Sequence, residues 1–162
     1  MSKSTVSSSF VFISLFFSLV LAIFPWPSFL QICRPEIVCL VVFYWVFVSP
    51  THFGITFGFS IGLLQSVIEA GVWGAHALGL IVAIYLLERF RKRVMNASLW
   101  EQSVLITIFV FVHQVLVAWM SYLFAYPVSF LVVLCTSIFS GFFWPVIFIG
   151  FNWVRRTYQI SH

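Results

Sequence analysis

The sequence predicts an all-α, polytopic membrane protein, and its composition and charge spacing support that fold class. Hydrophobic residues make up 62% of the 162 residues, and the mean hydropathy is +1.11. Only 7% of the residues are charged, which is too few for a water-facing surface of mixed polarity. The charges also leave long uncharged runs between them, and each run is long enough for a membrane-spanning helix of about 20 residues.

The positions of the Lys and Arg residues predict the number of crossings, because cytoplasmic loops are enriched in them. Basic residues occur at Lys3, in the "RFRKR" segment at 89–93, and at Arg155 and Arg156. All three groups fall on one side if the chain crosses six times, at about 8–24, 36–49, 54–69, 72–88, 99–120 and 129–152. We therefore expect residues 1–162 to form one integral membrane domain, a six-transmembrane-helix bundle with both termini cytoplasmic.

Three local features refine this topology. The first apolar segment lacks a small-x-small cleavage site, so we expect it to be retained as a span rather than removed as a signal peptide. Pro50 and Gly54 separate the second and third spans, both of which are short for a hydrocarbon layer about 30 Å thick. Pro145 is expected to kink the last helix.

Small residues recur at helical spacing in the third and fourth predicted spans. This spacing lets helices approach closely, and it also suits a face that receives a partner helix. A second interpretation is that the third span lines a polar cavity, since Gln65, Ser66 and Glu69 follow its glycines on the same face. The small residues are Gly54, Gly58, Gly62, Gly74, Gly79 and Ala83.

Polar residues near the predicted non-cytoplasmic ends of the spans are candidates for an outer mouth or pocket. Arg34 and Glu36 follow an irregular, proline-rich crossover, from which they can reach lipid headgroups or one another. Glu69 is either an interfacial carboxylate or part of a cavity, and His76 is either a structural group or the partner of Glu69. The full candidate set is Arg34, Glu36, Gln65, Ser66, Glu69 and His76.

The opposite side carries a basic collar, and two polar positions stand out on the fifth span. The collar is expected to attract anionic lipid or an acidic partner. On the fifth span, Gln114 lies on roughly the same side as Ser103, Thr107 and Ser121, while His113 is displaced from that side. The collar residues are Arg89, Arg91, Lys92, Arg93, Arg155 and Arg156.

The sequence contains no recognisable catalytic equipment. No nucleophile stands at a recognisable spacing from a base, and neither a Gly-rich phosphate loop nor a zinc-binding HExxH pattern occurs. The three cysteines lie in apolar neighbourhoods, where we interpret them as packing residues. We therefore expect no enzyme activity, no cofactor, no metal and no nucleic-acid partner.

Taken in order and spacing, several motifs resemble the MreD family of bacterial rod shape-determining proteins, in its proteobacterial type. The resemblance rests on "PWP" followed by "RP" before the second span, on "YWVFVSPTHFGITFGFSIGLL", on "GVWGAHAL", and on "GFFWPVIF" with a basic tail. These motifs cover nearly the whole chain. The family commonly has an aspartate after "GLL", whereas this chain has Gln65 and Ser66.

The resemblance implies a six-helix fold similar to the substrate-binding subunits of energy-coupling-factor transporters. It implies a non-enzymatic scaffold in the bacterial inner membrane that binds MreC and helps to maintain rod shape and lateral peptidoglycan synthesis. MreB and the peptidoglycan synthases are implied as further partners, direct or indirect. On this basis we expect a lipid-facing groove of small residues to receive the MreC helix. We also expect Arg34 and Glu36 to close the outer mouth or to contact MreC or a lipid-linked precursor.

Two other function classes stay open at this point. A transporter subunit would bind a small solute in an outer pocket lined by Gln65, Ser66, Glu69 and His76. A membrane enzyme acting on a lipid-linked substrate would need a convergent acid and base, for which only Glu69 and His76 are available.

Overall fold

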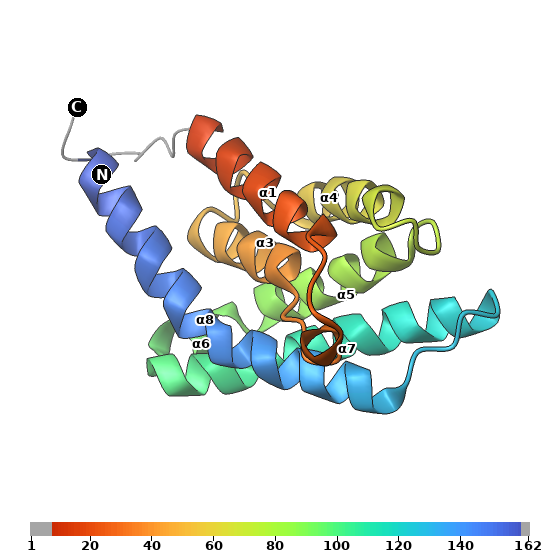
Figure 1. Cartoon of the computed structure of the whole chain (residues 1–162). Helices are drawn as coiled ribbons and strands as arrows, with labels where there is room; N and C mark the ends of the chain where they lie inside the picture. Colours follow the sequence, from red (N-terminus) through yellow and green to blue (C-terminus); the bar gives the residue numbers. More distant parts are fainter. Residues whose placement is uncertain (1–7, 160–162) are drawn as a thin grey trace.

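The structure of the chain, a computed structural model, describes residues 8–159, which form eight helices and no strand (Figure 1). Lys3 lies outside the described residues. The expected all-α class is confirmed. The helices are α1 (Ser8–Ile23), α2 (Ser28–Gln31), α3 (Ile37–Val48), α4 (Ile55–Ile68), α5 (Ala75–Arg89), α6 (Arg91–Asn96), α7 (Leu99–Leu123) and α8 (Phe130–Gln159).

Two of the described helices have the length and apolar character needed to cross a membrane. They are α7 and residues Phe130–Thr157 of α8, while α1, α3 and α4 are shorter apolar helices. Helices occupy all six ranges in which the sequence predicts spans, and that all six cross a membrane stays a prediction. The short helices α2 and α6 lie in segments that the sequence pattern assigned to loops.

Helix α3 forms the centre of the bundle. Its residues Val38–Val46 are each at most 2% exposed, and α1, α5 and α8 all pack against it. A helix that is apolar on every side has to be enclosed by other elements. Trp45 is the largest fully buried side chain, and its ring packs against Phe10 and Phe151 from the helices at the two ends of the chain.

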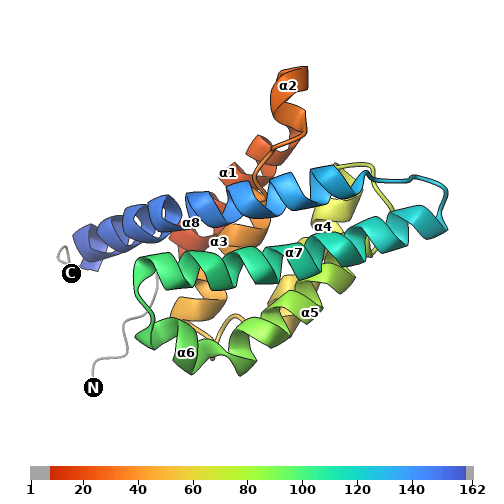
Figure 2. The ribbon, with the colours of Figure 1, turned by 90° about the horizontal axis from the view of Figure 1, so that it is seen from below.

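The remaining helices pack in chain order, α4 on α5, α5 on α7 and α7 on α8 (Figure 2). Glycines allow these close approaches. A Cβ atom on Gly62 would lie 2.5 Å from the Ala77 Cα atom of α5, and one on Gly79 would lie 2.7 Å from the His113 ring of α7. Gly58 faces Ile84 in the same way.

At Gly58, Gly62 and Gly79 the small-residue stripes therefore pack the protein's own helices against one another, and a partner groove along the stripes stays a prediction. Ala83 is fully buried within this packing. Two of the six small residues have other settings. Gly54 makes only an ordinary contact with Glu88, and Gly74 has a φ of +83°, a backbone conformation that favours glycine in the turn before α5.

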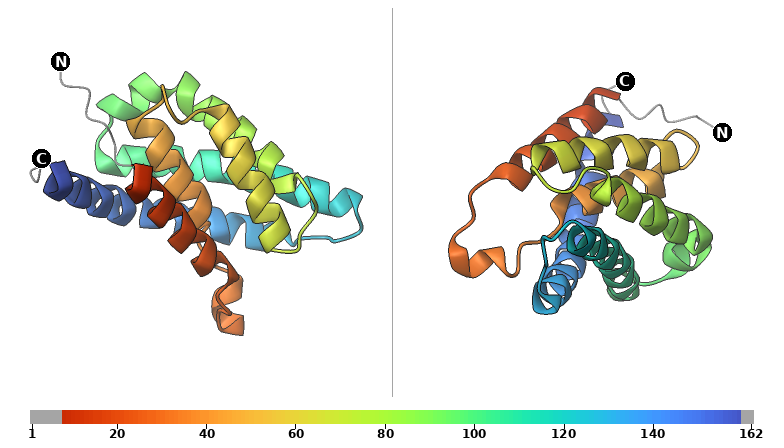
Figure 3. Two further views of the ribbon diagram at one scale, coloured as in Figure 1. Left: turned by 90° about the horizontal axis from the view of Figure 1, so that it is seen from above. Right: turned by 90° about the vertical axis from the view of Figure 1, so that its right-hand side faces the viewer.

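The two ends of the bundle differ in character. The start of α1, helix α6 and the end of α8 lie at one end, which we call the basic end (Figure 3). The α7–α8 turn lies at the other, which we call the turn end (Figure 3).

Helix α8 continues through Pro145 and bends along its length (Figure 1), since proline supplies no N–H for the carbonyl of Gly141.

Candidate functional site

Glu36 lies at the start of α3 and joins it to three other helices. Its Oε1 accepts a hydrogen bond from Gln65 Nε2 of α4, and its Oε2 accepts one from Gln114 Nε2 of α7 at 2.8 Å. Its backbone N–H donates to Ser140 Oγ of α8 at 2.8 Å. The side chain and the backbone N–H of Glu36 thus connect α3 to α4, α7 and α8.

Glu69, directly after α4, is the second carboxylate of the site. Gln65 Nε2 donates to Glu69 Oε1 at 3.0 Å, so one amide bridges the two carboxylates. Arg34 Nη2 lies 3.7 Å from Glu69 Oε1, and His76 Nε2 lies 3.6 Å from Glu69 Oε2. We call Arg34, Glu36, Gln65, Glu69, His76 and Gln114 the polar cluster.

Neighbouring polar groups hold the cluster in place. Ser66 Oγ donates to the carbonyl of Gly62 at 2.9 Å and accepts from the His76 backbone N–H at 3.3 Å, which joins α4 to α5. The rings of His76 and His113 lie 5.6 Å apart, and His113 is fully buried on α7. Arg34 also donates to the carbonyl of Ala22, which ties α1 to the cluster.

The electrostatics of the cluster favour a closed arrangement. The two carboxylates share the Gln65 amide, Arg34 lies beside Glu69, and the Arg34 and Glu69 side chains are only 33% and 23% exposed. Charged groups at membrane depth are costly unless they face the protein interior or pair with one another. Amide and guanidinium donors around both carboxylates meet that requirement. The arrangement fixes the positions of α1, α3, α4, α5 and α7 at one level of the bundle.

The structure brings together all of the residues that the sequence singled out as outer-mouth candidates. The pairing differs in one respect from the expectation that Arg34 and Glu36 can reach one another. Arg34 pairs instead with Glu69, directly after α4. Gln114 and Ser140 were not assigned to the site from the sequence. They lie 78 and 104 residues from Glu36, and their polarity within apolar helices was the only available signal.

A pocket of about 540 Å³ also lies at the turn end, beside the cluster's helices. None of Gln65, Ser66, Glu69 and His76, the residues expected to line a solute pocket, contributes to it. Its walls are apolar and aromatic, formed by Ala70, Gly71, Val72, Trp73, Ser121, Phe124 and Tyr126.

The basic collar divides into structural and exposed residues. Arg91 Nη2 donates to the carbonyl of Phe47 at 3.1 Å and so satisfies a carbonyl in the last turn of α3. Arg155 is half-buried near the Tyr44 hydroxyl, which donates to Asn152 Oδ1 at 3.0 Å. The other four side chains, those of Arg89, Lys92, Arg93 and Arg156, are exposed.

Comparisons with known proteins agree with the resemblance seen in the sequence. The family model described as rod shape-determining protein MreD matches residues 3–154. A rod shape-determining protein MreD from Haemophilus influenzae is 30% identical over 141 residues, which cover 87% of each chain. No solved structure matches, so the likeness to energy-coupling-factor subunits stays a prediction. The chain belongs to the MreD family of rod shape-determining proteins.

Proposed function

We propose that the protein is a non-enzymatic scaffold of the bacterial cell-elongation complex, held in the inner membrane by six crossing helices. The match to a rod shape-determining family over residues 3–154 is the observation that carries this function. Helices α1, α3, α4, α5, α7 and α8 are the six crossings. The basic end faces the cytoplasm, which agrees with the enrichment of Lys and Arg in cytoplasmic loops.

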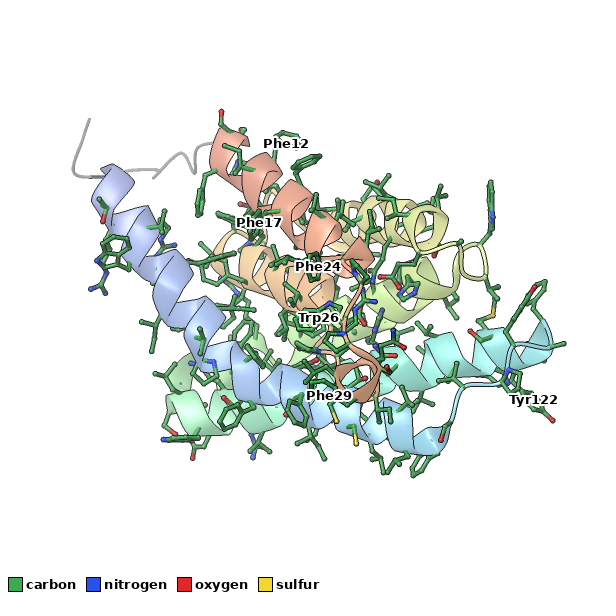
Figure 4. The ribbon with its side chains drawn as sticks, viewed as in Figure 1. Phe12, Phe17, Phe24, Trp26, Phe29 and Tyr122 are labelled. Carbon is green, nitrogen blue, oxygen red and sulfur yellow. The ribbon has the colours of Figure 1, made fainter. Side chains whose placement is uncertain are left out.

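The partner that this scaffold holds is MreC, through its transmembrane helix. Helix α1 packs mainly on α3, and the side of α1 away from that contact is exposed and rich in phenylalanine. Figure 4 shows these rings along α1 and on to α2. We call this surface the aromatic face, made of Phe12, Phe16, Phe17, Phe24 and Phe29.

The aromatic face suits a helical partner better than the glycine stripes do. Gly58, Gly62 and Gly79 are covered by neighbouring helices, whereas the phenylalanine rings are between 58% and 75% exposed. Aromatic side chains dominate interface energetics because each buries a large area. MreB and the peptidoglycan synthases then act with the complex of the two membrane proteins.

The polar cluster keeps the outer end of this scaffold closed. With Arg34 tied both to Glu69 and to the carbonyl of Ala22, the segment between α1 and α3 is held against α4. A closed end presents α1 to the partner in one fixed orientation. The cluster is therefore a positioning element of the scaffold and needs no ligand of its own.

Depletion of the gene in its rod-shaped host, combined with photo-crosslinking, tests this function. Cells should round up and swell as the protein runs out, and the gene should restore rods. In the rescued cells, a photo-reactive amino acid at Phe16 should crosslink to MreC. The same amino acid at Ile138, an exposed apolar position on α8, is the control and should not.

Two results would contradict the proposal. Rods that persist through depletion would exclude the elongation function. Rounding with no crosslink from any position on the aromatic face would keep the function and exclude this docking surface.

A further inference from the structure

A pocket of about 550 Å³ opens where α6 meets α7, at the basic end of the bundle. Figure 2 shows α6 folded back beside the first turns of α7. The volume falls in the range of about 300–1,000 Å³ that is common for small-molecule sites. Its walls combine charged, polar and apolar side chains, namely Arg93, Asn96, Ala97, Glu101, Val104 and Leu105.

The pocket brings two opposite charges together without pairing them. Arg93 of α6 and Glu101 of α7 are both exposed, and neither takes part in an ion pair within residues 8–159. A capping box fixes Glu101, whose Oε2 accepts from the Ser98 backbone N–H at 2.8 Å while its own N–H donates to Ser98 Oγ. The Glu101 carboxylate is therefore held at the pocket wall through one oxygen, and its other oxygen stays available to an external donor.

The tryptophans of α7 place this pocket at the level of lipid headgroups. Trp100 is 75% exposed and Trp119 is 55% exposed. They are separated by a rise of about 28 Å at 1.5 Å per residue, close to the hydrocarbon thickness of about 30 Å. Exposed tryptophans mark the two membrane interfaces. Glu101 follows Trp100 directly, so the pocket lies at one interface.

An apolar track leads from the pocket toward the opposite interface. Val104 and Ile108 are exposed on successive turns of α7, and Val115 continues the same side of the helix. Val104 also forms part of the pocket wall. A molecule with a charged head in the pocket can therefore lay an alkyl chain along this track.

We propose that the pocket between α6 and α7 binds the zwitterionic headgroup of phosphatidylethanolamine. The phosphate pairs with Arg93 and accepts from the Asn96 amide, and the ammonium pairs with Glu101. One acyl chain follows Val104 and Ile108. Phosphatidylglycerol offers the same phosphate but no cation, so it leaves Glu101 unpaired next to an anionic lipid. The two charges of opposite sign on the pocket wall thus select the zwitterion over the anionic lipid.

Lipid titration of the purified full-length chain in detergent, followed by native mass spectrometry, tests the proposal. We expect wild type to bind phosphatidylethanolamine about tenfold more tightly than phosphatidylglycerol, in line with one charge-assisted contact. Glu101→Gln should abolish this preference, and it should keep the fold because glutamine serves equally in a capping box. Arg93→Gln should weaken both lipids about tenfold.

Lys92→Gln is the matched control, since it removes one exposed positive charge from α6 outside the pocket. It should leave the affinity for phosphatidylethanolamine unchanged. Equal affinities of wild type for the two lipids would overturn the proposal, as would a preference that survives in Glu101→Gln. Equal weakening by Lys92→Gln and Arg93→Gln would also overturn it and would indicate diffuse attraction to the membrane surface. None of these outcomes depends on MreC.

Discussion

Glu36 joins α3 to three other helices of the bundle. Its two carboxylate oxygens accept from Gln65 and Gln114, which come from different helices. Removing the carboxylate leaves the partly buried Gln114 amide without its acceptor, whereas the Gln65 amide keeps Glu69 as a second acceptor. Stranding a buried donor costs about 1–3 kcal/mol, more than the hydrogen bond itself contributes.

We therefore expect Glu36→Ala to lower the free energy of unfolding by about 1–3 kcal/mol, while Glu36→Gln, which keeps one carbonyl acceptor, has a smaller effect. Denaturant titration in detergent, followed by the loss of helical circular dichroism, measures both. Glu88 forms no hydrogen bond through its carboxylate within residues 8–159, so Glu88→Ala is the control. Equal losses in Glu36→Ala and Glu88→Ala would mean that the cluster does not stabilise the bundle.

The sequence predicted the members of the polar cluster better than their partners. Arg34, Glu36 and Glu69 are identifiable because charges are rare in so apolar a chain. Which of them pair is set by the rotation of α4 about its axis and by the path of the segment between α1 and α3. Hydropathy determines neither quantity. Arg34 therefore pairs with Glu69, 35 positions further along the sequence, and Gln114 joins from α7.

At the scale of elements, the shortness of α3 has a structural explanation. Its 12 residues rise about 18 Å, well below a hydrocarbon thickness of about 30 Å. A short helix in contact with lipid has to thin the bilayer or draw in flanking residues. Helix α3 avoids that requirement because α1, α5 and α8 pack around it, so the sides of its buried stretch Val38–Val46 meet protein rather than lipid.

The contact between α4 and α5 depends on the absence of a side chain at Gly62. A Cβ atom there would lie 2.5 Å from Ala77 Cα and 2.7 Å from Ala77 N, and backbone cannot yield as a side-chain tip can. We expect Gly62→Ala to separate the two helices and to lower the melting temperature by several degrees, as a cost of about 1–3 kcal/mol would.

Gly150→Ala is the matched control for this prediction. Gly150 lies in α8 with no atom within 4 Å of its Cβ position, so alanine should be neutral or stabilise the helix by up to about 1 kcal/mol. Thermal unfolding of both variants in the same detergent gives the comparison. A Gly62→Ala protein as stable as Gly150→Ala would show that α4 and α5 can repack without cost.

The main helices follow from the sequence because long apolar runs, separated by charges and by the proline break at Pro50, mark where they begin and end. The short helices do not. Helix α6 consists largely of Arg91, Lys92 and Arg93, which a charge count assigns to a solvated loop. It is helical because Val94 is buried in the core and Arg91 bonds to the end of α3, which are tertiary contacts.

At the scale of the whole molecule, charge and geometry agree on an orientation. Arg89, Lys92, Arg93 and Arg156 are exposed at the basic end, whereas the polar cluster binds its one arginine internally. Exposed Lys and Arg next to a span stay on the cytoplasmic side. In the proposed topology, the end of the bundle that holds the polar cluster is then the outer one.

Six crossings predict that successive loops lie alternately outside the membrane and on its cytoplasmic side. This prediction is the most demanding test of the molecule as a whole. Single cysteines introduced into a chain that lacks Cys33, Cys39 and Cys135 can be labelled with a membrane-impermeant maleimide in intact spheroplasts and again after permeabilisation. Labelling from outside is expected at 28, 73 and 129, and labelling only after permeabilisation at 51, 92 and 156; the wild-type residues at all six are exposed.

Position 51 decides between six crossings and four. It lies in the turn between α3 and α4, two helices of 12 and 14 residues that are both shorter than an ordinary span. If these helices form a hairpin that enters and leaves from the outer face, a cysteine in place of Thr51 will react without permeabilisation while those at 92 and 156 stay protected. If α3 and α4 cross, the cysteine at 51 will be protected like those at 92 and 156. The surrounding helices then allow α3 to cross within the protein, although it is too short to cross lipid on its own.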